Sequence, residues 1–450
     1  MALYRFAMMG AALAALAADA PDRIEKGLLP AFAIKGEPAV AWTMAERMSE
    51  YKTPGVTVAF VSDGKIAWAR AYGDGITTET MFQAASISKP VAAMVAMKLV
   101  EQGKLALDED VNARLKRWKV PESEFTAKEK VTLRRLLSHT AGLTVHGFRG
   151  YAEGEPVPTL VELLDGKKPA NSAAVRADME PGSKWRYSGG GYQVMQLLVE
   201  DVTGKPFAEV ARELVLEPLG MKNSTYEQPL KDARRVGAAR GHRSDGTMIK
   251  GQWHTYPEQA AAGLWTTPSD LARVVLEIQK PGRILKPETV AEMLRAVQGG
   301  YGLGFGLGLD SFSHGGSNEG FKCMLFAYRQ KGQAMVLMTN GDRGSALGGE
   351  ILRAISAEYN WMDHQQGVKT VVTVTPEALA ALAGEYVEPS GGKIAVAVKG
   401  AGLAVTRQGR TVEVIPEGPS RFFSRTAEVP DLVFEGGELR GGGVRAKRVQ

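Results

Sequence analysis

Apolar residues in the first hundred positions follow first a strand pattern and then a helix pattern. The apolar runs 56–61 and 66–72 predict two strands, and the polar segment 62–65 between them predicts the turn of a hairpin. Apolar residues recur at helical spacing over 91–100, which predicts a buried helix that ends before Gly103. The pattern therefore predicts a hairpin followed directly by a core helix.

The later part of the chain continues both patterns. Glycine alternates with apolar residues over 301–309 and predicts a tightly packed strand, while 323–328 and 334–339 predict a second hairpin. Residues 146–170 contain several Gly and Pro residues and predict an irregular loop that borders a cleft. Further helices are expected at 38–52, 131–143, 193–202, 268–279 and 345–361.

The C-terminal part of the chain differs from the rest. Short strand-like runs such as 393–398 and 403–405, broken by glycine, predict a small antiparallel β domain. We therefore expect a leader at 1–20, a main domain at 21–365 and the β domain at 372–450.

Composition narrows the class of protein. The chain has 450 residues, of which 44% are apolar and 23% charged, as in ordinary soluble globular proteins with two or three domains. A net charge of +5 without a basic stripe argues against nucleic acid as a partner. Cys323 is the only cysteine, so no internal disulfide forms, and its apolar surroundings indicate a core residue.

The N-terminus has the pattern of a secretory leader. Arg5 precedes the apolar run 6–17, and Ala15-Leu16-Ala17 offers small residues for cleavage. A buried N-terminal helix is the alternative, because the charged region is thin. We expect an exported protein, periplasmic or secreted, without a membrane-spanning segment after the leader is removed.

Candidate chemistry lies at Ser86-Ile87-Ser88-Lys89, at or near the start of the predicted core helix. A spacing of three places Ser86 and Lys89 on one helical face, where the amine can accept the proton of the hydroxyl. Nearby main-chain N–H groups would stabilise an oxyanion. A second Ser-x-x-Lys, Ser49 to Lys52, is disfavoured because no helix is predicted after it.

Two glycine-containing segments add to this candidate site. Tyr187 and Ser188 precede Gly189-Gly190-Gly191, and three consecutive glycines indicate a close main-chain approach. Taken alone, a loop that needs positive φ angles is the preferred interpretation of these glycines. The other segment, 313–321, contains His314-Gly315-Gly316-Ser317 and precedes the second predicted hairpin.

Four segments in this order resemble the serine β-lactamase and penicillin-recognising superfamily over about residues 35–362. They are Ser86-Ile87-Ser88-Lys89, Leu136-Leu137-Ser138-His139-Thr140-Ala141-Gly142-Leu143, Tyr187-Ser188-Gly189 and His314-Gly315-Gly316. The chain looks closest to class C β-lactamases, family VIII carboxylesterases and D-aminopeptidase-type hydrolases. The resemblance implies an α+β fold with an antiparallel sheet flanked by helices and a helical subdomain. It also implies that the C-terminal part is the small β domain often appended to these hydrolases.

The resemblance also implies roles for individual residues. Ser86 would be the acylated nucleophile, Lys89 its proton acceptor and Tyr187 a second base that later activates water. His314-Gly315-Gly316 would replace the family's Lys-Thr-Gly strand, and the main-chain N–H groups of Ser86 and Ser317 would form the oxyanion hole. Such acyl transfer needs no metal and no organic cofactor.

Two departures from the family pattern affect substrate preference. Gly189 stands where the family has an asparagine that holds a substrate amide, which weakens the case for β-lactams and peptides. His314 stands where the family has a permanent cation, so we expect carboxylate binding that is weaker and depends on pH near neutrality.

We therefore expect a serine hydrolase for small carboxylic esters or amides. One alternative is a peptidase for D-amino-acid or cell-wall peptides with weak β-lactam hydrolysis. Another is a penicillin-binding sensor that is acylated once without turnover. His139 is expected to be structural, His314 functional, and Trp265 either core or site-lining. The natural substrate and the oligomeric state stay open.

Overall fold

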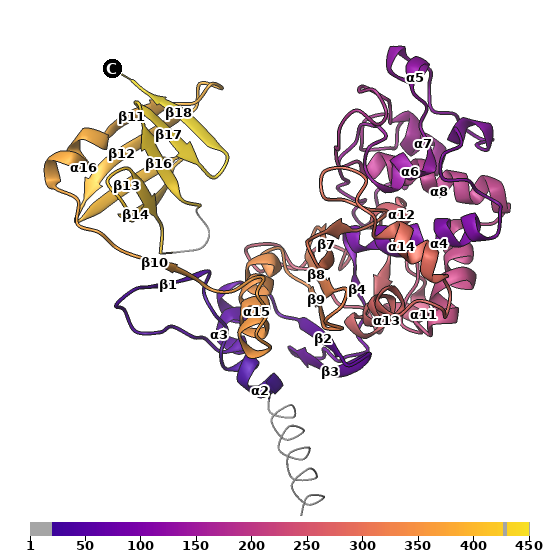
Figure 1. Cartoon of the computed structure of the whole chain (residues 1–450), viewed down its shortest axis with the longest axis horizontal. Coiled ribbons are helices and arrows are strands. Elements are labelled where there is room, and N and C mark those ends of the chain that lie inside the picture. Colours follow the sequence, from indigo (N-terminus) through magenta and orange to yellow (C-terminus); the bar gives the residue numbers. More distant parts are fainter. Residues whose placement is uncertain (1–19, 426–429, 450) are drawn as a thin grey trace, which may run out of the picture. The chain divides into compact units, whose positions relative to one another are not determined.

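The computed structural model describes residues 20–425 and 430–449 (Figure 1). All but the last residue of the predicted leader, 1–20, therefore lies outside the described residues. The chain divides into two compact units, of which one spans 47–348 and the other combines the described residues up to 46 with those from 349 onward. The predicted domain limits stay predictions.

The larger unit is built on a six-stranded sheet in which all neighbouring strands are antiparallel, in the order β3-β2-β9-β8-β7-β6. Every residue of β2 except its last is buried, as expected for a strand near the sheet's centre, whereas the edge strand β3 is partly exposed. Both predicted hairpins are confirmed. The strands are β2 (Val56–Ser62), β3 (Lys65–Tyr72), β6 (Gly306–Leu307), β7 (Ser311–Asn318), β8 (Phe321–Tyr328) and β9 (Ala334–Thr339).

The predicted strand at 301–309 is wrong except for the two residues of β6. The chain turns here because Gly304 has a φ of +95° and the N–H of Gly302 donates to the carbonyl of Phe305 at 2.9 Å. Glycine in this stretch serves turns and close packing, and a period of two along the sequence does not distinguish these uses from a strand.

Helices surround the sheet and make up the rest of this unit. Helix α13 (Pro268–Gln279) has the predicted bounds and packs on β2, β3 and β9. The remaining helices of the unit are η1 (Ala85–Ile87), α4 (Ser88–Glu101), η2 (Val111–Ala113), α5 (Glu124–Lys128), α6 (Leu133–Leu137), α7 (Leu160–Asp165), α8 (Gly189–Thr203), α9 (Phe207–Ala211), η3 (Arg212–Leu216), α10 (Glu217–Leu219), α11 (Asp232–Arg235), α12 (Gln259–Ala262) and α14 (Pro287–Met293). A short pair, β4 (Phe82–Gln83) and β5 (Trp265–Thr266), lies next to them.

Several predicted helices have different limits in the structure. The helix expected at 131–143 is only α6, because His139 and Gly142 have φ values of 60° and 68° and leave the helical conformation. The helix expected at 38–52 is α3 (Met44–Glu50), which begins after Thr43, whose hydroxyl accepts from the N–H of Glu46 at 3.2 Å. Helix α7 interrupts the loop expected at 146–170, and α15 (Gly344–Glu358) replaces the helix expected at 345–361.

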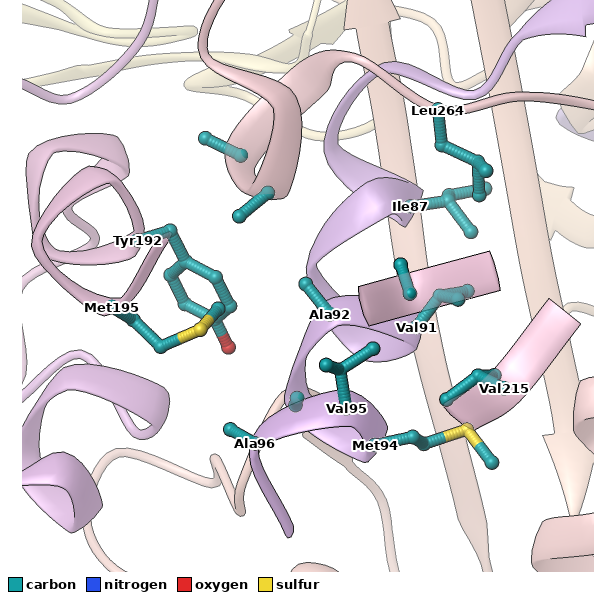
Figure 2. Packing of buried hydrophobic residues seen from close by; sticks show 14 of the residues in the cluster. Ile87, Val91, Ala92, Met94, Val95, Ala96, Tyr192, Met195, Val215 and Leu264 are labelled. Carbon is teal, nitrogen blue, oxygen red and sulfur yellow. The ribbon is translucent and has the colours of Figure 1, made fainter. Parts of the chain in front are cut away.

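The predicted core helix is the pair η1 and α4, and it is buried on nearly all sides. Figure 2 shows Tyr192 and Met195 of α8 directed toward α4, where the small side chains of Ala92 and Ala96 face them. No side chain caps α4, whose N-cap is Ile87. Ser86 therefore precedes the α-helix inside a 3₁₀ turn, and its hydroxyl is not used as a cap.

The second unit contains an eight-stranded closed antiparallel barrel, which confirms the predicted small β domain. Strand β11 pairs with both β12 and β18, so the barrel has no free edge. The barrel strands are β11 (Gly384–Val387), β12 (Lys393–Lys399), β13 (Gly402–Arg407), β14 (Arg410–Pro416), β15 (Arg421–Phe423), β16 (Leu432–Glu435), β17 (Glu438–Gly441) and β18 (Val444–Arg448). The unit also contains α2 (Ala20–Glu25), α16 (Pro376–Leu382) and a parallel pair, β1 (Phe32–Ile34) with β10 (Gly367–Lys369).

Strand β7 lies directly against the turn that precedes Ser86. A methyl group on Gly316 would lie 2.3 Å from the carbonyl oxygen of Ala84, far inside van der Waals contact. A methyl group on the neighbouring Gly315 would meet no atom within 4 Å. The approach of the strand to this turn therefore requires glycine at 316 but not at 315.

We expect Gly316→Ala to lower the free energy of unfolding by about 1–3 kcal/mol, because the added methyl forces two main-chain segments apart. The matched control Gly315→Ala should change it by less than about 0.5 kcal/mol. Urea unfolding followed by circular dichroism measures both. Equal effects of the two substitutions would contradict this account.

Candidate active site

Ser86 is the only residue of 81–90 that is not buried. Its Oγ accepts a hydrogen bond from Nζ of Lys89 at 3.1 Å. The preceding Ala85 has a φ of 50°, a left-handed conformation that costs a non-glycine residue about 1–2 kcal/mol. Strained main chain of this kind persists where the surrounding structure holds a side chain in a particular place. The turn thus exposes the hydroxyl of Ser86, which is hydrogen-bonded to Lys89, while the residues around it in the sequence are buried.

Lys89 is 2% exposed, and its ammonium group is held by oxygen atoms and aromatic rings. Besides Ser86, Nζ donates to the carbonyl of Ala261 at 2.7 Å. It lies 5.0 Å from the ring centre of Tyr187 and 5.6 Å from that of Tyr192. Within the described part of the chain, no carboxylate forms an ion pair with Lys89. The amine can therefore exchange a proton with Ser86 without competition from a bound carboxylate.

Tyr187 is partly exposed and lies among three histidines. Its ring centre lies 4.2 Å from that of His139, 5.0 Å from that of His146 and 6.2 Å from that of His314. The family resemblance links His314 with this tyrosine, whereas it does not link His139 or His146 with it. No spacing in the sequence indicates these two contacts, because they depend on how the segment 139–146 folds back.

His139 fixes the main chain beside Tyr187. Its Nδ1 accepts the N–H of Ser188 at 3.1 Å, so the neutral ring carries its proton on Nε2. Burial, and then the charge of Lys89, lowers the pKa of His139 well below its ordinary value. This bond supports the expected structural role of His139, whose ring also packs on Tyr187.

His314 is buried and uncharged, which corrects the expectation that it titrates near neutrality. Burial, followed by the charge of Lys89, lowers its pKa to about 3, although the carbonyl of Gly315 favours the charged form. The Nδ1–H group donates to that carbonyl at 2.6 Å, and Nε2 has no hydrogen-bond partner among the described residues. A carboxylate group of a substrate would therefore meet no cation at position 314.

Gly189, Gly190 and Gly191 form the first turn of α8, and none of them has a positive φ, so the loop interpretation is wrong. The close-approach interpretation is confirmed. A methyl group on Gly189 would lie 2.7 Å from Cε2 of Phe148, and one on Gly190 would lie 2.6 Å from the carbonyl oxygen of Thr144. The ring of Phe148 therefore occupies the space that a side chain at position 189 would need.

Main-chain groups complete the arrangement around Ser86. The contact of Gly316 with Ala84 brings β7 alongside η1, so the segment that contains Ser317 runs beside the turn that contains Ser86. Gly315 is exposed and has open space on its side-chain face. The structure thus brings Lys89, Tyr187 and His314 together near Ser86, and Ser317 lies on the strand that runs beside that serine's turn.

Other candidates lie outside this site. Trp265 is fully buried and packs its ring 4.9 Å from that of Trp253 and 5.8 Å from that of Phe321, so it is a core residue. Burial raises the pKa of the Cys323 thiol to about 12, as expected for a core cysteine. Among residues 20–425 and 430–449, no three His, Cys, Asp or Glu side chains gather as metal ligands would. In the same residues no helix combines the length and apolar character needed to span a membrane.

Known proteins resemble this chain in sequence and in structure. The family model described as Beta-lactamase matches residues 40–358. Penicillin-binding protein 4 of Amycolatopsis lactamdurans is 26% identical over 375 residues, which cover 76% of this chain and 95% of that protein. Esterase EstB of Burkholderia gladioli is 27% identical over 298 residues, which cover 57% of this chain and 73% of that protein.

A solved structure extends the resemblance to the C-terminal unit. The octameric penicillin-binding protein homologue from Pyrococcus abyssi superimposes with a TM-score of 0.59 at 22% identity and covers 90% of this chain and 98% of that chain. The fold is β-lactamase/transpeptidase-like, with an eight-stranded antiparallel barrel in the C-terminal part. Because the family model spans most of the chain and Ser86, Lys89 and Tyr187 meet within it, the protein belongs to the Beta-lactamase family of serine hydrolases.

Proposed function

We propose that the protein hydrolyses small carboxylic esters or amides through an acyl-enzyme on Ser86. The observation that carries this proposal is the hydrogen bond between Ser86 Oγ and the buried amine of Lys89, at 3.1 Å. A buried amine next to a hydroxyl is the arrangement that activates a serine nucleophile. Tyr187 lies within 5.0 Å of the same amine, measured from its ring centre, and is the second group that can relay a proton.

The reaction has two halves. In the first, Ser86 Oγ bonds to the substrate's carbonyl carbon while its proton passes to neutral Lys89, and the main-chain N–H groups of Ser86 and Ser317 stabilise the oxyanion. The alcohol or amine then leaves with a proton delivered through Lys89 and Tyr187. In the second, Tyr187 takes a proton from water while its own hydroxyl proton passes to neutral Lys89, and the water oxygen bonds to the acyl carbon. The bond to Ser86 Oγ then breaks, Lys89 returns the proton to that oxygen, and the acid and Ser86 are freed.

The surroundings of Ser86 favour neutral esters over β-lactams. Gly189 supplies no amide group to hold a substrate amide, and Phe148 fills the space where such a group would lie. His314 supplies no charge for a carboxylate. Both differences remove polar contacts that bicyclic β-lactams and D-amino-acid peptides would use, whereas an uncharged acyl group needs neither. The resemblance to a protein named as an esterase supports this proposal.

The first prediction from the proposed function concerns the nucleophile and the substrate class together. The purified protein should turn over p-nitrophenyl butyrate many times per chain and cleave a chromogenic cephalosporin slowly, because only the ester lacks groups that need residues 189 and 314. Ser86→Ala should abolish ester turnover. Release of product is followed by absorbance against this variant as the blank.

Other outcomes of that experiment have definite meanings. Fast cephalosporin cleavage would favour the β-lactamase or peptidase alternative, and one acyl group per chain without turnover would favour a sensor. Wild-type turnover by Ser86→Ala would exclude Ser86 as the nucleophile.

A second prediction concerns the space beside Gly189. Gly189→Asn should lower the free energy of unfolding by about 1–3 kcal/mol, since the new side chain meets the ring of Phe148. Combining it with Phe148→Ala should restore much of this stability and raise kcat/KM for the cephalosporin above that of either single variant. Thermal unfolding and cephalosporin kinetics of the three variants provide the measurement. Strictly additive effects would contradict the shared space.

A third prediction follows from the depressed pKa of His314. The folded protein keeps this ring neutral down to about pH 3, whereas the unfolded chain binds a proton below about pH 6.5. The free energy of unfolding should therefore fall as pH decreases from about 6.5 toward 3. His314→Gln should remove part of this dependence, and the exposed histidine variant His146→Gln should remove less.

Urea unfolding at about pH 7.0 and at about pH 4.5 measures how the free energy of unfolding of the three proteins changes with pH. An identical pH dependence in wild type and His314→Gln would show that His314 binds its proton equally in the folded and unfolded states.

A further inference from the structure

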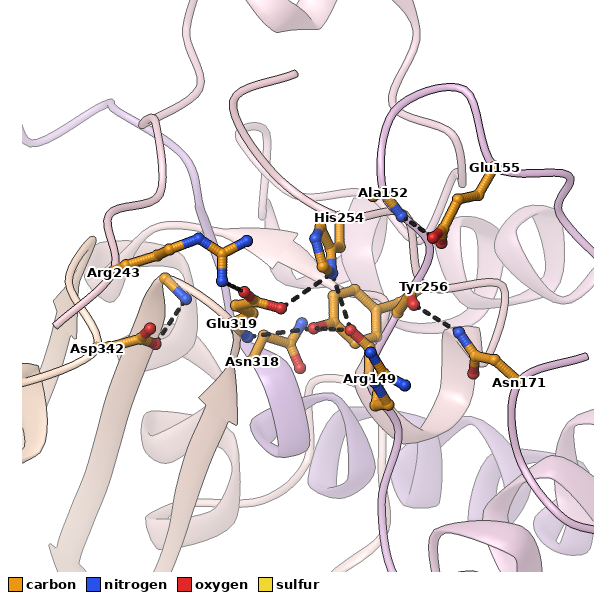
Figure 3. A network of polar contacts seen from close by, with 12 residues as sticks. Arg149, Ala152, Glu155, Asn171, Arg243, His254, Tyr256, Asn318, Glu319 and Asp342 are labelled. Carbon is orange, nitrogen blue, oxygen red and sulfur yellow. Dashed lines mark hydrogen bonds and ion pairs between the residues drawn. The ribbon is translucent and has the colours of Figure 1, made fainter. Parts of the chain in front are cut away.

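A polar network outside the reacting groups holds the segment 149–151 against the segment 253–256 (Figure 3). Tyr151 and Thr255 exchange two main-chain hydrogen bonds, each 2.8 Å long. Between them, a methyl group on Gly150 would lie 2.6 Å from Cζ of Tyr256, so the two segments are in direct contact. His254 adds the side-chain link, with its Nδ1 2.9 Å from the carbonyl oxygen of Arg149.

The same nitrogen of His254 faces the turn between β7 and β8. Nδ1 lies 3.3 Å from Oε2 of Glu319, a carboxylate that also pairs with Arg243. Because a carbonyl and a carboxylate only accept, Nδ1 of His254 carries a proton and shares it between them. The hydroxyl of Tyr256 accepts the N–H of Glu319 at 3.2 Å, which places a second bond beside the first.

The main chain of His254 connects to the nucleophile's own segment. Its carbonyl oxygen accepts from Nε2 of Gln83 at 2.7 Å, and Oε1 of that glutamine accepts from the side chain of Asn318 at 2.8 Å. Gln83 lies three residues before Ser86, and Asn318 directly follows Ser317. One buried residue, 8% exposed, therefore touches three segments that border the site.

The segment that His254 holds leads directly to the catalytic tyrosine. Phe148 precedes Arg149 and places its ring against Gly189, and His146 accepts the N–H of Gly189 at 3.1 Å with its main-chain oxygen. The ring of His146 lies 5.0 Å from that of Tyr187. A displacement of Arg149 would therefore move the two side chains that border Tyr187 and Gly189.

We propose that His254 and Glu319 are positioning residues that hold residues 146–149 beside Tyr187 and thereby set how large an acyl group the site accepts. This inference rests on the proposed ester hydrolysis at Ser86. Neither residue touches the reacting atoms. Their shared proton ties the main chain of Arg149, next to Phe148, to the turn that follows β7. The hydrogen bonds, rather than the bulk of the imidazole, therefore set the position of Phe148 beside Gly189.

The test uses the full chain with two substitutions at one position. His254→Asn retains an N–H donor near the place of Nδ1, whereas His254→Leu retains bulk without a donor. In His254→Leu we expect KM for p-nitrophenyl butyrate to rise about tenfold, with kcat less affected. The ratio of kcat/KM for p-nitrophenyl octanoate to that for p-nitrophenyl butyrate should rise at least about threefold, because Phe148 moves away from Gly189. His254→Asn should recover most of both changes.

Glu319→Gln and a variant of a histidine elsewhere in the sequence serve as comparisons for His254→Leu. Glu319→Gln keeps an acceptor for Nδ1 and should lie between wild type and His254→Leu in selectivity. His364 belongs to the other compact unit, and His364→Leu should leave the ester ratio unchanged. A purely structural role for His254 would reduce kcat equally for all esters, in parallel with the melting temperature, and would overturn the proposal.

A measurement without substrate separates this inference from the proposed function. Amide hydrogen exchange over 146–151 should be faster in His254→Leu than in wild type and near wild type in His254→Asn. Equal exchange in all three proteins would overturn the positioning role even if ester turnover is confirmed. If ester turnover does not depend on Ser86, the proposed function is overturned. The hydrogen-exchange result then still reports whether His254 holds residues 146–151 in place.

Discussion

The buried ammonium group of Lys89 is the constraint on which the rest of the site depends. Removing a charge from water costs several kcal/mol unless other groups replace its hydration, and no carboxylate of the described residues does so here. Instead, Ser86 Oγ and the carbonyl oxygen of Ala261 accept its protons, while two tyrosine rings face it. The serine and helix α12 must therefore keep their places for this charge to be tolerated.

The same charge determines which neighbours can ionise. It adds to burial in lowering the pKa of His139 and of His314, so both rings stay neutral and act through hydrogen bonds and packing. Of Lys89, His139 and His314, only Lys89 therefore carries a charge, and it must lose its proton before it can accept that of Ser86. A substrate without a charge of its own needs no further ionised group at these positions.

Features with local sequence signals could be predicted, and features set by distant contacts could not. The pairing of Ser86 with Lys89 follows from helical spacing, and both hairpins follow from alternation and turn residues. The neutral state of His314 depends on burial by segments far away in the sequence, so the residue type alone led to the wrong pKa. The sequence likewise reveals glycine at position 189 as a departure from the family pattern, but only the position of Phe148 explains it. Closure of the barrel through β11 and β18 joins strands from opposite ends of the domain and has no local signal.

The contact between Phe148 and Gly189 has a consequence for how this lineage can change its specificity. An asparagine at 189 is obstructed while the phenylalanine ring is present, whereas a smaller residue at 148 leaves the existing glycine undisturbed. The two substitutions are therefore epistatic, and their order matters. A mutational path to an amide side chain at 189 is therefore less costly when residue 148 changes first, because only the opposite order passes through a protein with a steric clash.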